Sequence, residues 1–281
     1  MKTKGLIVIL AVLAIFLVAI GFRADSGNLL RLTDGKKMSL KQALPDLAGA
    51  RAVFIGELHN RKSHHAAQLE VIRALKEAGV PVAVGLEMFQ KKSQQQLNKW
   101  VEGGMSESEF RPLYYRNWNL DWSLYADIFR YARKQRIPMI ALNVRPEIVK
   151  QVAREGFGSL TPGQKAQLPP VTCVVDKDYK EFIRRALGAH GHGGMEFTNF
   201  CEAQLLWDSA MAVHLLDHLK DHPGCTMVVI AGRGHAWKQG IPRQVKMRSD
   251  LPVRVILPQV AGRNEADSLT PKDADYLWLN E

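Results

Sequence analysis

The sequence predicts an α/β protein with a mainly parallel sheet flanked by helices and a smaller helical insertion. Short apolar runs recur along the chain at residues 52–55, 82–86, 139–142 and 227–231. Continuous apolarity without alternation is typical of strands that are buried on both faces. Helical patterns lie between these runs, and this alternation favours parallel strands joined by right-handed crossovers. Two later segments, "LPVRVILP" and "DYLWLN", are expected to extend the sheet.

Three helices are expected from their apolar periodicity and their start signals. The first follows residues 52–55 and has Ser63 as a predicted N-cap, and "DWSLYADIFRYARKQ" predicts a second helix capped by Asp121. In "NFCEAQLLWDSAMAVHLLDHLK", Asn199 and Glu202 resemble a capping box at the start of a third. Residues from about 146 to 199 break the strand-helix rhythm, so we expect a mostly helical insertion there.

The N-terminus predicts export. Lys2 and Lys4 precede an apolar run from residue 5 to residue 22, and polar residues follow. This order is typical of a signal peptide or signal anchor, so residues 1–24 are set apart from the α/β domain at 25–281. The basic end should stay in the cytoplasm. The domain is then expected outside it, anchored on the outer side of the cytoplasmic membrane, or periplasmic or extracellular if the segment is cleaved.

The composition limits the partners. The 281 residues carry a formal net charge of +10, which favours anionic lipid headgroups or carboxylate-bearing ligands. No zinc-finger, recognition-helix or RNA-binding pattern is present, so no nucleic acid is expected. Cys173, Cys201 and Cys225 show no CxxC spacing, and either one disulfide or three free thiols fits them. A homodimer is compatible with the sequence.

Polar side chains follow each of the four apolar runs. In open parallel sheets, ligands bind beyond the carboxyl ends of the strands, so four strands that end in this way predict a site there. The residues at these ends are Glu57, His59, Glu87, Asn143, Arg145 and His235.

Two kinds of chemistry are compatible with these side chains. Glu57, His59 and His235 could hold a divalent metal ion with open positions. Alternatively, Glu57, His59, Glu87 and His235 could act as general acids and bases without a metal. The sequence has no HExxH motif, no GxSxG nucleophile elbow and no Walker loop. It therefore lacks the signatures of standard zinc proteases, of hydrolases with a serine elbow and of P-loop nucleotide-binding enzymes.

Further residues are candidates for ligand binding. His64 and His65 stand at the start of the first crossover helix, whose positive end should keep His64 neutral, and His64 is expected to be the inward-facing residue of the two. Gln204 and Asp208 share a helical face, and Asp208 could orient a site histidine. The aromatic stretch "FRPLYYRNWNLDWSLY" is expected to be core, and "HGHGG" is expected to be a solvated loop.

An ordered set of motifs carries a family resemblance. "FIGELHNRKSHHAAQ", "GLEMF", "ALNVR", "CEAQLLWDSAMA" and "AGRGHAWKQGIP" resemble the ChaN family of haem-binding uptake proteins, which is related to the Tiki and TraB group and to erythromycin esterases. The resemblance runs from about Ala52 to Pro242. Members often carry a lipobox cysteine, which this chain lacks. Arg233 also stands where the family's late motif usually has Asn.

The resemblance implies an exported, membrane-associated protein that binds haem in haem or iron uptake. Its axial ligand would be a Tyr or a His, and the candidates are His64, His65, Tyr114, Tyr115 and Tyr125. The Tiki relatives imply the alternative, a metal-dependent or Glu/His hydrolase, with Glu57, His59 and His235 at the matching positions. Haem is therefore the expected cofactor, and a divalent metal ion is the alternative.

Overall fold

The computed structural model describes residues 28–187, 196–262 and 264–279. Within these ranges, eight strands form one sheet in the order β2-β1-β8-β7-β3-β6-β4-β5. The strands are β1 (Leu29–Arg31), β2 (Lys36–Met38), β3 (Ala52–Glu57), β4 (Val82–Gln90), β5 (Met139–Asn143), β6 (Thr226–Gly232), β7 (Val253–Pro258) and β8 (Tyr276–Trp278).

The sheet is parallel from β8 to β5, which confirms the predicted fold class. β3 lies at its centre and pairs in parallel with β6 on one side and β7 on the other. β4 pairs with β6 and β5, and β7 pairs with β8, all in parallel. Only the edge departs from this pattern, because β1 pairs antiparallel with β8 and with β2.

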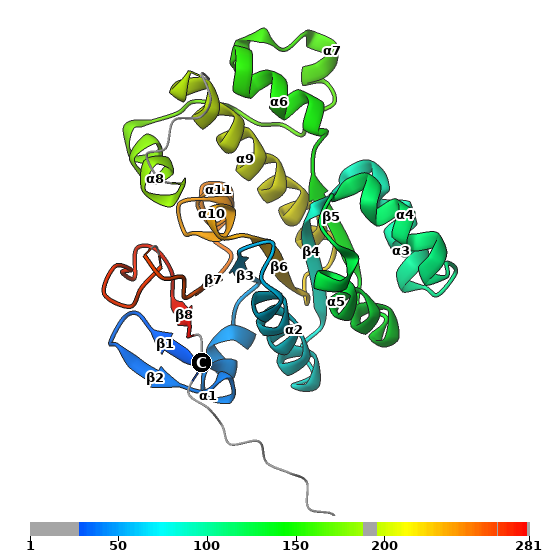
Figure 1. Cartoon of the computed structure of the whole chain (residues 1–281), viewed down its shortest axis with the longest axis vertical. Coiled ribbons are helices and arrows are strands. Elements are labelled where there is room, and N and C mark those ends of the chain that lie inside the picture. The colour runs from blue at the N-terminus through cyan, green and yellow to red at the C-terminus, as the bar shows by residue number, and fades with distance from the viewer. Residues whose placement is uncertain (1–27, 188–195, 263, 280–281) are drawn as a thin grey trace, which may run out of the picture.

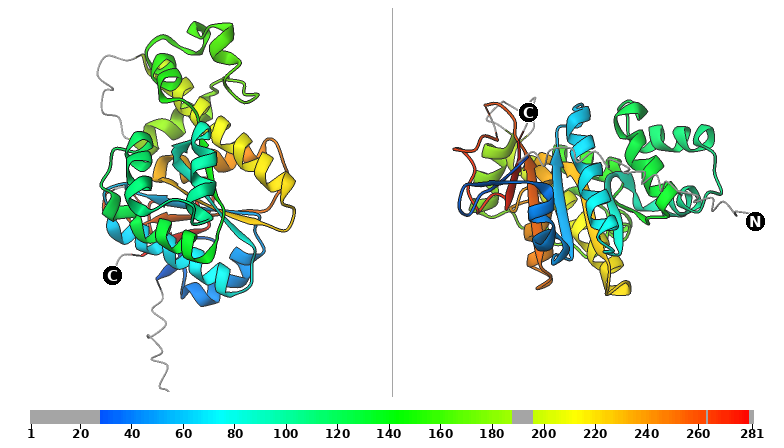
Figure 2. Two further views of the ribbon diagram at one scale, coloured as in Figure 1. Left: turned by 90° about the vertical axis from the view of Figure 1, so that its right-hand side faces the viewer. Right: turned by 90° about the horizontal axis from the view of Figure 1, so that it is seen from below.

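Helices cover both faces of the sheet (Figures 1 and 2). Their bounds are α1 (Leu40–Ala48), α2 (Lys62–Glu77), η1 (Lys91–Ser93), α3 (Gln94–Val101), α4 (Glu107–Asn117), α5 (Trp122–Gln135), α6 (Pro146–Glu155), η2 (Phe157–Ser159), α7 (Pro162–Lys165), α8 (Lys177–Leu187), α9 (Phe197–Asp221), α10 (Arg233–Ala236) and α11 (Ile241–Lys246).

Alternate residues of each strand supply two separate cores. Val53 and Ile55 of β3 pack with side chains from α1, α2, α4 and α5 on one face. Ala52 and Phe54 of the same strand pack with α8, α9 and α11 on the other. Because successive side chains of a strand point to opposite faces, an apolar strand without alternation is needed to fill both cores.

The helix starts differ in part from the expected ones. Asp121 caps α5 as predicted, since its carboxylate accepts a hydrogen bond from the Ser123 amide at 2.7 Å. α2 begins at Lys62 with Arg61 as its N-cap, so Ser63 lies inside the helix. α9 begins at Phe197 and is capped by Glu196, whose carboxylate accepts from the Asn199 amide. The predicted capping box was therefore placed three residues too late.

The segment after β5 is helical, and its first part packs on α9, whereas α8 also packs on the sheet. α6, η2, α7 and α8 lie within residues 146–187. Ile148, Val149 and Val152 of α6 form a small core with Ala203 and Leu206 of α9. Figure 1 shows α6 and α7 at one end of the molecule, beyond the sheet.

Two further predictions concern the thiols and the membrane. Cys173, Cys201 and Cys225 are all free thiols. No helix in the described ranges combines the length and apolar character needed to span a bilayer. The predicted export segment at residues 1–24 and the "HGHGG" stretch lie outside the described residues.

Candidate functional site at the strand ends

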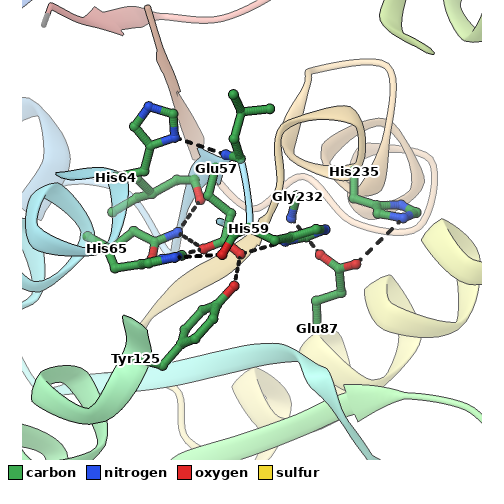
Figure 3. Close-up of polar contacts among 11 residues, drawn as sticks. Glu57, His59, His64, His65, Glu87, Tyr125, Gly232 and His235 are labelled. Atoms are coloured by element: carbon green, nitrogen blue, oxygen red, sulfur yellow. Dashed lines mark hydrogen bonds and ion pairs between the residues drawn. The ribbon is translucent and has the colours of Figure 1, made fainter. Parts of the chain in front are cut away.

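Polar side chains come together at the carboxyl edge of the sheet, and Figure 3 shows Glu57 and Glu87 there with His59 and His235. Glu57 is the last residue of β3, and its register partner Gly232 is the last residue of β6. Glu87 lies on β4, and Asn143 ends β5. The predicted convergence of strand ends is therefore present in the fold.

The carboxylate of Glu57 is fully buried and accepts hydrogen bonds from four side chains. Oε1 accepts from Nδ1 of His59 at 2.7 Å and from the hydroxyl of Tyr125 in a short hydrogen bond. Oε2 accepts from Nε2 of Gln68 at 2.7 Å and faces Nδ1 of His65 at 3.0 Å. A buried carboxylate with this many donors is stable in its charged form.

His65 lies between acceptors on both sides of its ring. Its Nε2 is 3.0 Å from the backbone carbonyl oxygen of His59, which can only accept. Its Nδ1 faces Oε2 of Glu57 and lies 3.2 Å from Oε1 of Gln68. Both nitrogens must therefore carry hydrogen, and His65 is an imidazolium ion paired with Glu57. Burial lowers the pKa of His65, but the hydrogen bond and charge of Glu57 outweigh burial and raise it.

His59 presents its free edge to the solvent side of the site. Nδ1 donates to Glu57, the side chain is 38% exposed, and the ring meets Trp118 edge-on at 4.9 Å between centroids. Burial lowers the pKa of His59, but the hydrogen bond to Glu57 and the charge of Glu87 raise it overall. Nε2 is thus the one site nitrogen next to Glu57 that can exchange a proton with a ligand.

The carboxylate of Glu87 lies between His59 and His235. Its Oε2 accepts from the Gly232 amide at 2.5 Å, and its Oε1 lies 3.8 Å from Nε2 of His235. A Cβ atom at Gly232 would lie 2.8 Å from Cε1 of His59 and 3.6 Å from Oε2 of Glu87. Only glycine leaves room here for the His59 ring and the Glu87 carboxylate to approach the end of β6 together.

His235 is oriented by a buried carboxylate on α9. Nδ1 donates to Oδ1 of Asp208 at 2.7 Å, and Oδ2 of Asp208 accepts from the hydroxyl of Tyr179 at 2.7 Å. Burial lowers the pKa of His235, but the charges of Glu87 and Asp208 raise it to about 9. Asp208 therefore orients a site histidine, as the sequence suggested.

The remaining predicted site residues lie around this centre in different ways. Asn143 donates from Nδ2 to the Glu87 carbonyl oxygen at 2.6 Å, so it supports the backbone of β4. Gln204 is half-buried one turn before Asp208. Arg145 is exposed at the N-cap of α6, where it donates to Gln167 at 2.7 Å and lies 3.8 Å from Glu147. These contacts turn Arg145 toward the helical segment.

His64 and His65 are both buried, but they face different places. Nδ1 of His64 accepts from the Leu58 amide at 2.9 Å, which leaves the ring hydrogen on Nε2. Burial and the neighbouring charge of His65 lower the pKa of His64 to about 4, so its ring is neutral as expected. His64 lines a groove of about 1510 Å³ between α1, α2 and the end of β8, whereas His65 reaches Glu57.

The aromatic stretch is mostly core, which confirms the expectation. Tyr114, Trp122 and Tyr125 are buried among Phe110 and Phe129. Burial raises the pKa of Tyr114, and burial together with the charge of Glu57 raises the pKa of Tyr125. Tyr115 differs, since it is 43% exposed, and its hydroxyl accepts from the Trp122 amide.

The metal-binding alternative stays a prediction. Within residues 28–187, 196–262 and 264–279, no three His, Cys, Asp or Glu side chains are arranged to hold a metal ion. Both oxygens of Glu57 are already engaged by four donors. A metal at Glu57, His59 and His235 would therefore displace existing hydrogen bonds.

Sequence reasoning missed three contributors. Gln68 lies on the buried face of α2, and its hydrogen bond to Glu57 was not predicted. Tyr179 was not singled out, although it lies on the apolar face of α8 with Phe182 and Ile183. Trp207, edge-on to His235 at 5.4 Å, was also missed. Helical periodicity could have placed all three inward, but it does not reveal their polar partners.

Comparison with known proteins finds solved structures that resemble this chain. The structure of ChaN of Campylobacter jejuni, which describes cofacial haem binding, matches with a TM-score of 0.69 at 19% identity over 89% of this chain and 94% of that one. A mutant of the erythromycin esterase EreC in its open conformation matches with a TM-score of 0.49 at 15% identity, over 82% of this chain and 76% of that one. The type III effector HopBA1 matches with a TM-score of 0.48 at 16% identity, over 85% of this chain and 91% of that one. No curated protein sequence matches the chain.

The family assignment rests on the sequence itself. The family model described as haem-binding uptake, Tiki superfamily, ChaN, matches residues 43–245, which is well over half of the chain. This range spans β3, β4, β5 and β6 and includes Glu57, Glu87, Asp208 and His235. The chain therefore belongs to the ChaN family of haem-binding uptake proteins in the Tiki superfamily.

Proposed function

We propose that this protein binds haem and carries it in haem or iron uptake. The observation that carries the proposal is the family match over residues 43–245. Structural likeness to ChaN of Campylobacter jejuni supports the shared fold. We also propose that haem binds in the groove lined by His64.

The groove suits the two chemical parts of haem, an apolar ring and two carboxylates. Its volume of about 1510 Å³ exceeds the roughly 300–1,000 Å³ of ordinary small-ligand pockets. Leu40, Leu44, Leu58 and Trp278 give it apolar walls. The bases Lys41, Arg61 and Arg73 also line it, together with the acids Glu70 and Glu77. Apolar walls would hold the ring, and the bases would pair with the propionates.

His64 fits as an iron ligand after one proton shift. In the structure its Nδ1 accepts the Leu58 amide and its hydrogen is on Nε2. Ligation through Nε2 needs the hydrogen on Nδ1, which gives up the bond from Leu58. Leaving that amide without a partner costs about 1–3 kcal/mol, which an iron–nitrogen bond can offset. The low pKa of His64, about 4, keeps a proton from competing for the nitrogen at neutral pH.

The tyrosines are less suited to this role in the groove. A tyrosine ligand binds iron as phenolate, and burial raises the pKa of both Tyr114 and Tyr125. Tyr125 also donates its hydroxyl hydrogen to Glu57. Tyr115 is accessible but lies on α4, away from the residues that line the groove.

A hemin titration followed by absorbance tests the proposal. We expect a saturable Soret band at a defined stoichiometry, with a changed band position in His64→Ala and an unchanged one in Tyr115→Phe. A flat response of the wild-type chain would overturn haem binding. A band changed by Tyr115→Phe and not by His64→Ala would overturn the assignment to the groove.

Export and membrane association form the second part of the proposal. The support is the order of Lys2, Lys4 and the apolar run at residues 5–22, and the membrane partner is this N-terminal segment. A C-terminally tagged chain should fractionate with membranes and be cleaved by protease added outside the cytoplasm. Full protection from that protease would contradict export. Analytical ultracentrifugation with and without hemin would test the homodimer.

A second candidate function is Glu/His acid–base hydrolysis at the strand ends. The observation that favours it is the pair of carboxylate-oriented imidazoles, Glu57–His59 and Asp208–His235, with Glu87 between them. Such pairs fix the ring tautomer and leave Nε2 for proton transfer. Hydrolysis of ester or peptide substrates that is lost in both His59→Ala and His235→Ala would support it. Activity unchanged by both substitutions would exclude it.

A further inference from the structure

Beyond haem binding, we propose that His218 and His222 form a binding site for a divalent transition-metal ion on α9. His218 lies in the last turn of α9, and His222 is the C-cap residue that follows its last residue, Asp221. Histidines at positions i and i+4 share one face of a helix and can bind the same ion. Neither residue takes part in the strand-end site or lines the groove around His64.

The two rings already lie side by side. Their centroids are 4.1 Å apart and their planes differ by 19°, so they are stacked. A metal ion lies in the plane of each imidazole that binds it, so both rings must turn out of this stack by side-chain rotation to share one ion.

The hydrogen bond of His222 leaves one of its nitrogens available. Nδ1 of His222 lies 2.9 Å from the backbone carbonyl oxygen of His218. A carbonyl oxygen only accepts, so Nδ1 carries the hydrogen and Nε2 of the neutral ring keeps its lone pair. A histidine whose Nδ1 donates to a backbone carbonyl is the usual form of a metal ligand.

His218 contributes a polar nitrogen without a hydrogen-bond partner. Its Nε2 is buried and accepts or donates no hydrogen bond among the described residues. Buried polar atoms of this kind are uncommon, and a bound ion is one explanation for them. Burial and the charges of His222 and Lys91 lower the pKa of His218 to about 4, so the ring is neutral at pH 7.

The surroundings hold the helix end in place. Arg51 donates from Nη2 to the carbonyl oxygens of Leu219 and His222, at 3.1 and 3.2 Å. Asp221 attracts a cation near His218, and Lys91 opposes it. The two charges offset each other, so the imidazole lone pairs supply most of the affinity.

The two imidazole ligands determine which metal ions this site would bind. Neutral imidazole suits Zn²⁺, Ni²⁺ and Cu²⁺, whereas Mg²⁺ and Ca²⁺ prefer oxygen ligands. With two ligands from the protein, water would complete the coordination shell. The order of affinity should place Cu²⁺ above Ni²⁺.

The test uses the full chain free of metal and haem, with His190→Ala and His192→Ala to remove the other closely spaced histidines. Calorimetry with Ni²⁺ should show one ion per chain. Adding His222→Ala or His218→Asn should weaken binding by at least about tenfold, because chelation by two ligands is lost. Electron paramagnetic resonance with Cu²⁺ should show coupling to two imidazole nitrogens.

The control is Lys220→Ala, an exposed change between the two histidines, and it should leave Ni²⁺ affinity unchanged. Circular dichroism checks that each variant is folded. Ni²⁺ affinity unchanged by His222→Ala in folded protein would overturn the proposal. A Cu²⁺ spectrum without two-nitrogen coupling would also overturn it.

Discussion

Glu57 and His65 form a buried ion pair at the base of the strand-end site, with Nδ1 of His65 3.0 Å from Oε2 of Glu57. Both side chains are almost completely inaccessible to solvent. Because Nε2 of His65 also donates to the His59 carbonyl, the imidazolium links α2 to the loop after β3. The pair thus holds the segment that carries His59.

Glu57→Gln should destabilise the fold strongly. Loss of the carboxylate leaves the buried His65 charge unpaired, and breaking a buried pair in this way costs about 3–5 kcal/mol. Urea unfolding measures the free energy of unfolding. The control Glu77→Gln, at an exposed position of α2, should change it by no more than about 0.5 kcal/mol. Equal effects of the two substitutions would contradict the ion-pair account.

Gly232→Ala should displace the His59 ring. The new Cβ would lie 2.8 Å from Cε1 of His59, which is closer than real contacts allow. Overpacking of this kind costs about 1–3 kcal/mol, and NMR should show a shifted His59 ring signal. Gly163→Ala is the matched control, since no atom lies within 4 Å of its added Cβ. An unchanged His59 signal in Gly232→Ala would show that the ring does not lie against β6.

The free energy of unfolding should fall as the pH rises from about 6.5 to 9. The pKa of His235 is raised from 6.5 to about 9 in the folded chain, against the effect of burial, by Glu87 and Asp208. A group with a raised folded pKa stabilises below its unfolded pKa, and this contribution is lost as pH passes the folded value. Urea unfolding at several pH values should show a smaller fall in His235→Gln. Parallel curves for the two proteins would contradict a protonated His235.

Much of the fold could be predicted because buried parallel strands leave a simple pattern. The runs that became β3, β4, β5 and β6 are continuously apolar, since each strand fills a core on both faces. The hairpin of β1 and β2 could not be found in this way. Its three-residue strands "LLR" and "KKM" are too short and too polar at the edge to show a period.

The location of the site could be predicted from the sequence, but the pairing of its side chains could not. Parallel strands bring their carboxyl ends to one edge, so Glu57, Glu87 and His235 had to be near one another. Which histidine meets Glu57 depends on the rotation of α2, and His65 takes that place while His64 faces the groove. The start of α2 is set by Arg61 without a side-chain cap, so no sequence signal fixed that rotation.

The most direct test of the central claim is a hemin titration that compares two charge-matched double variants. Arg61→Ala with Arg73→Ala removes two bases from the groove around His64, and Arg133→Ala with Arg136→Ala removes two from a separate groove of about 390 Å³. We predict at least about tenfold weaker hemin binding in the first variant, because charge-assisted hydrogen bonds to the propionates are lost, and wild-type binding in the second. Equal affinity in all three proteins would contradict haem binding in this groove.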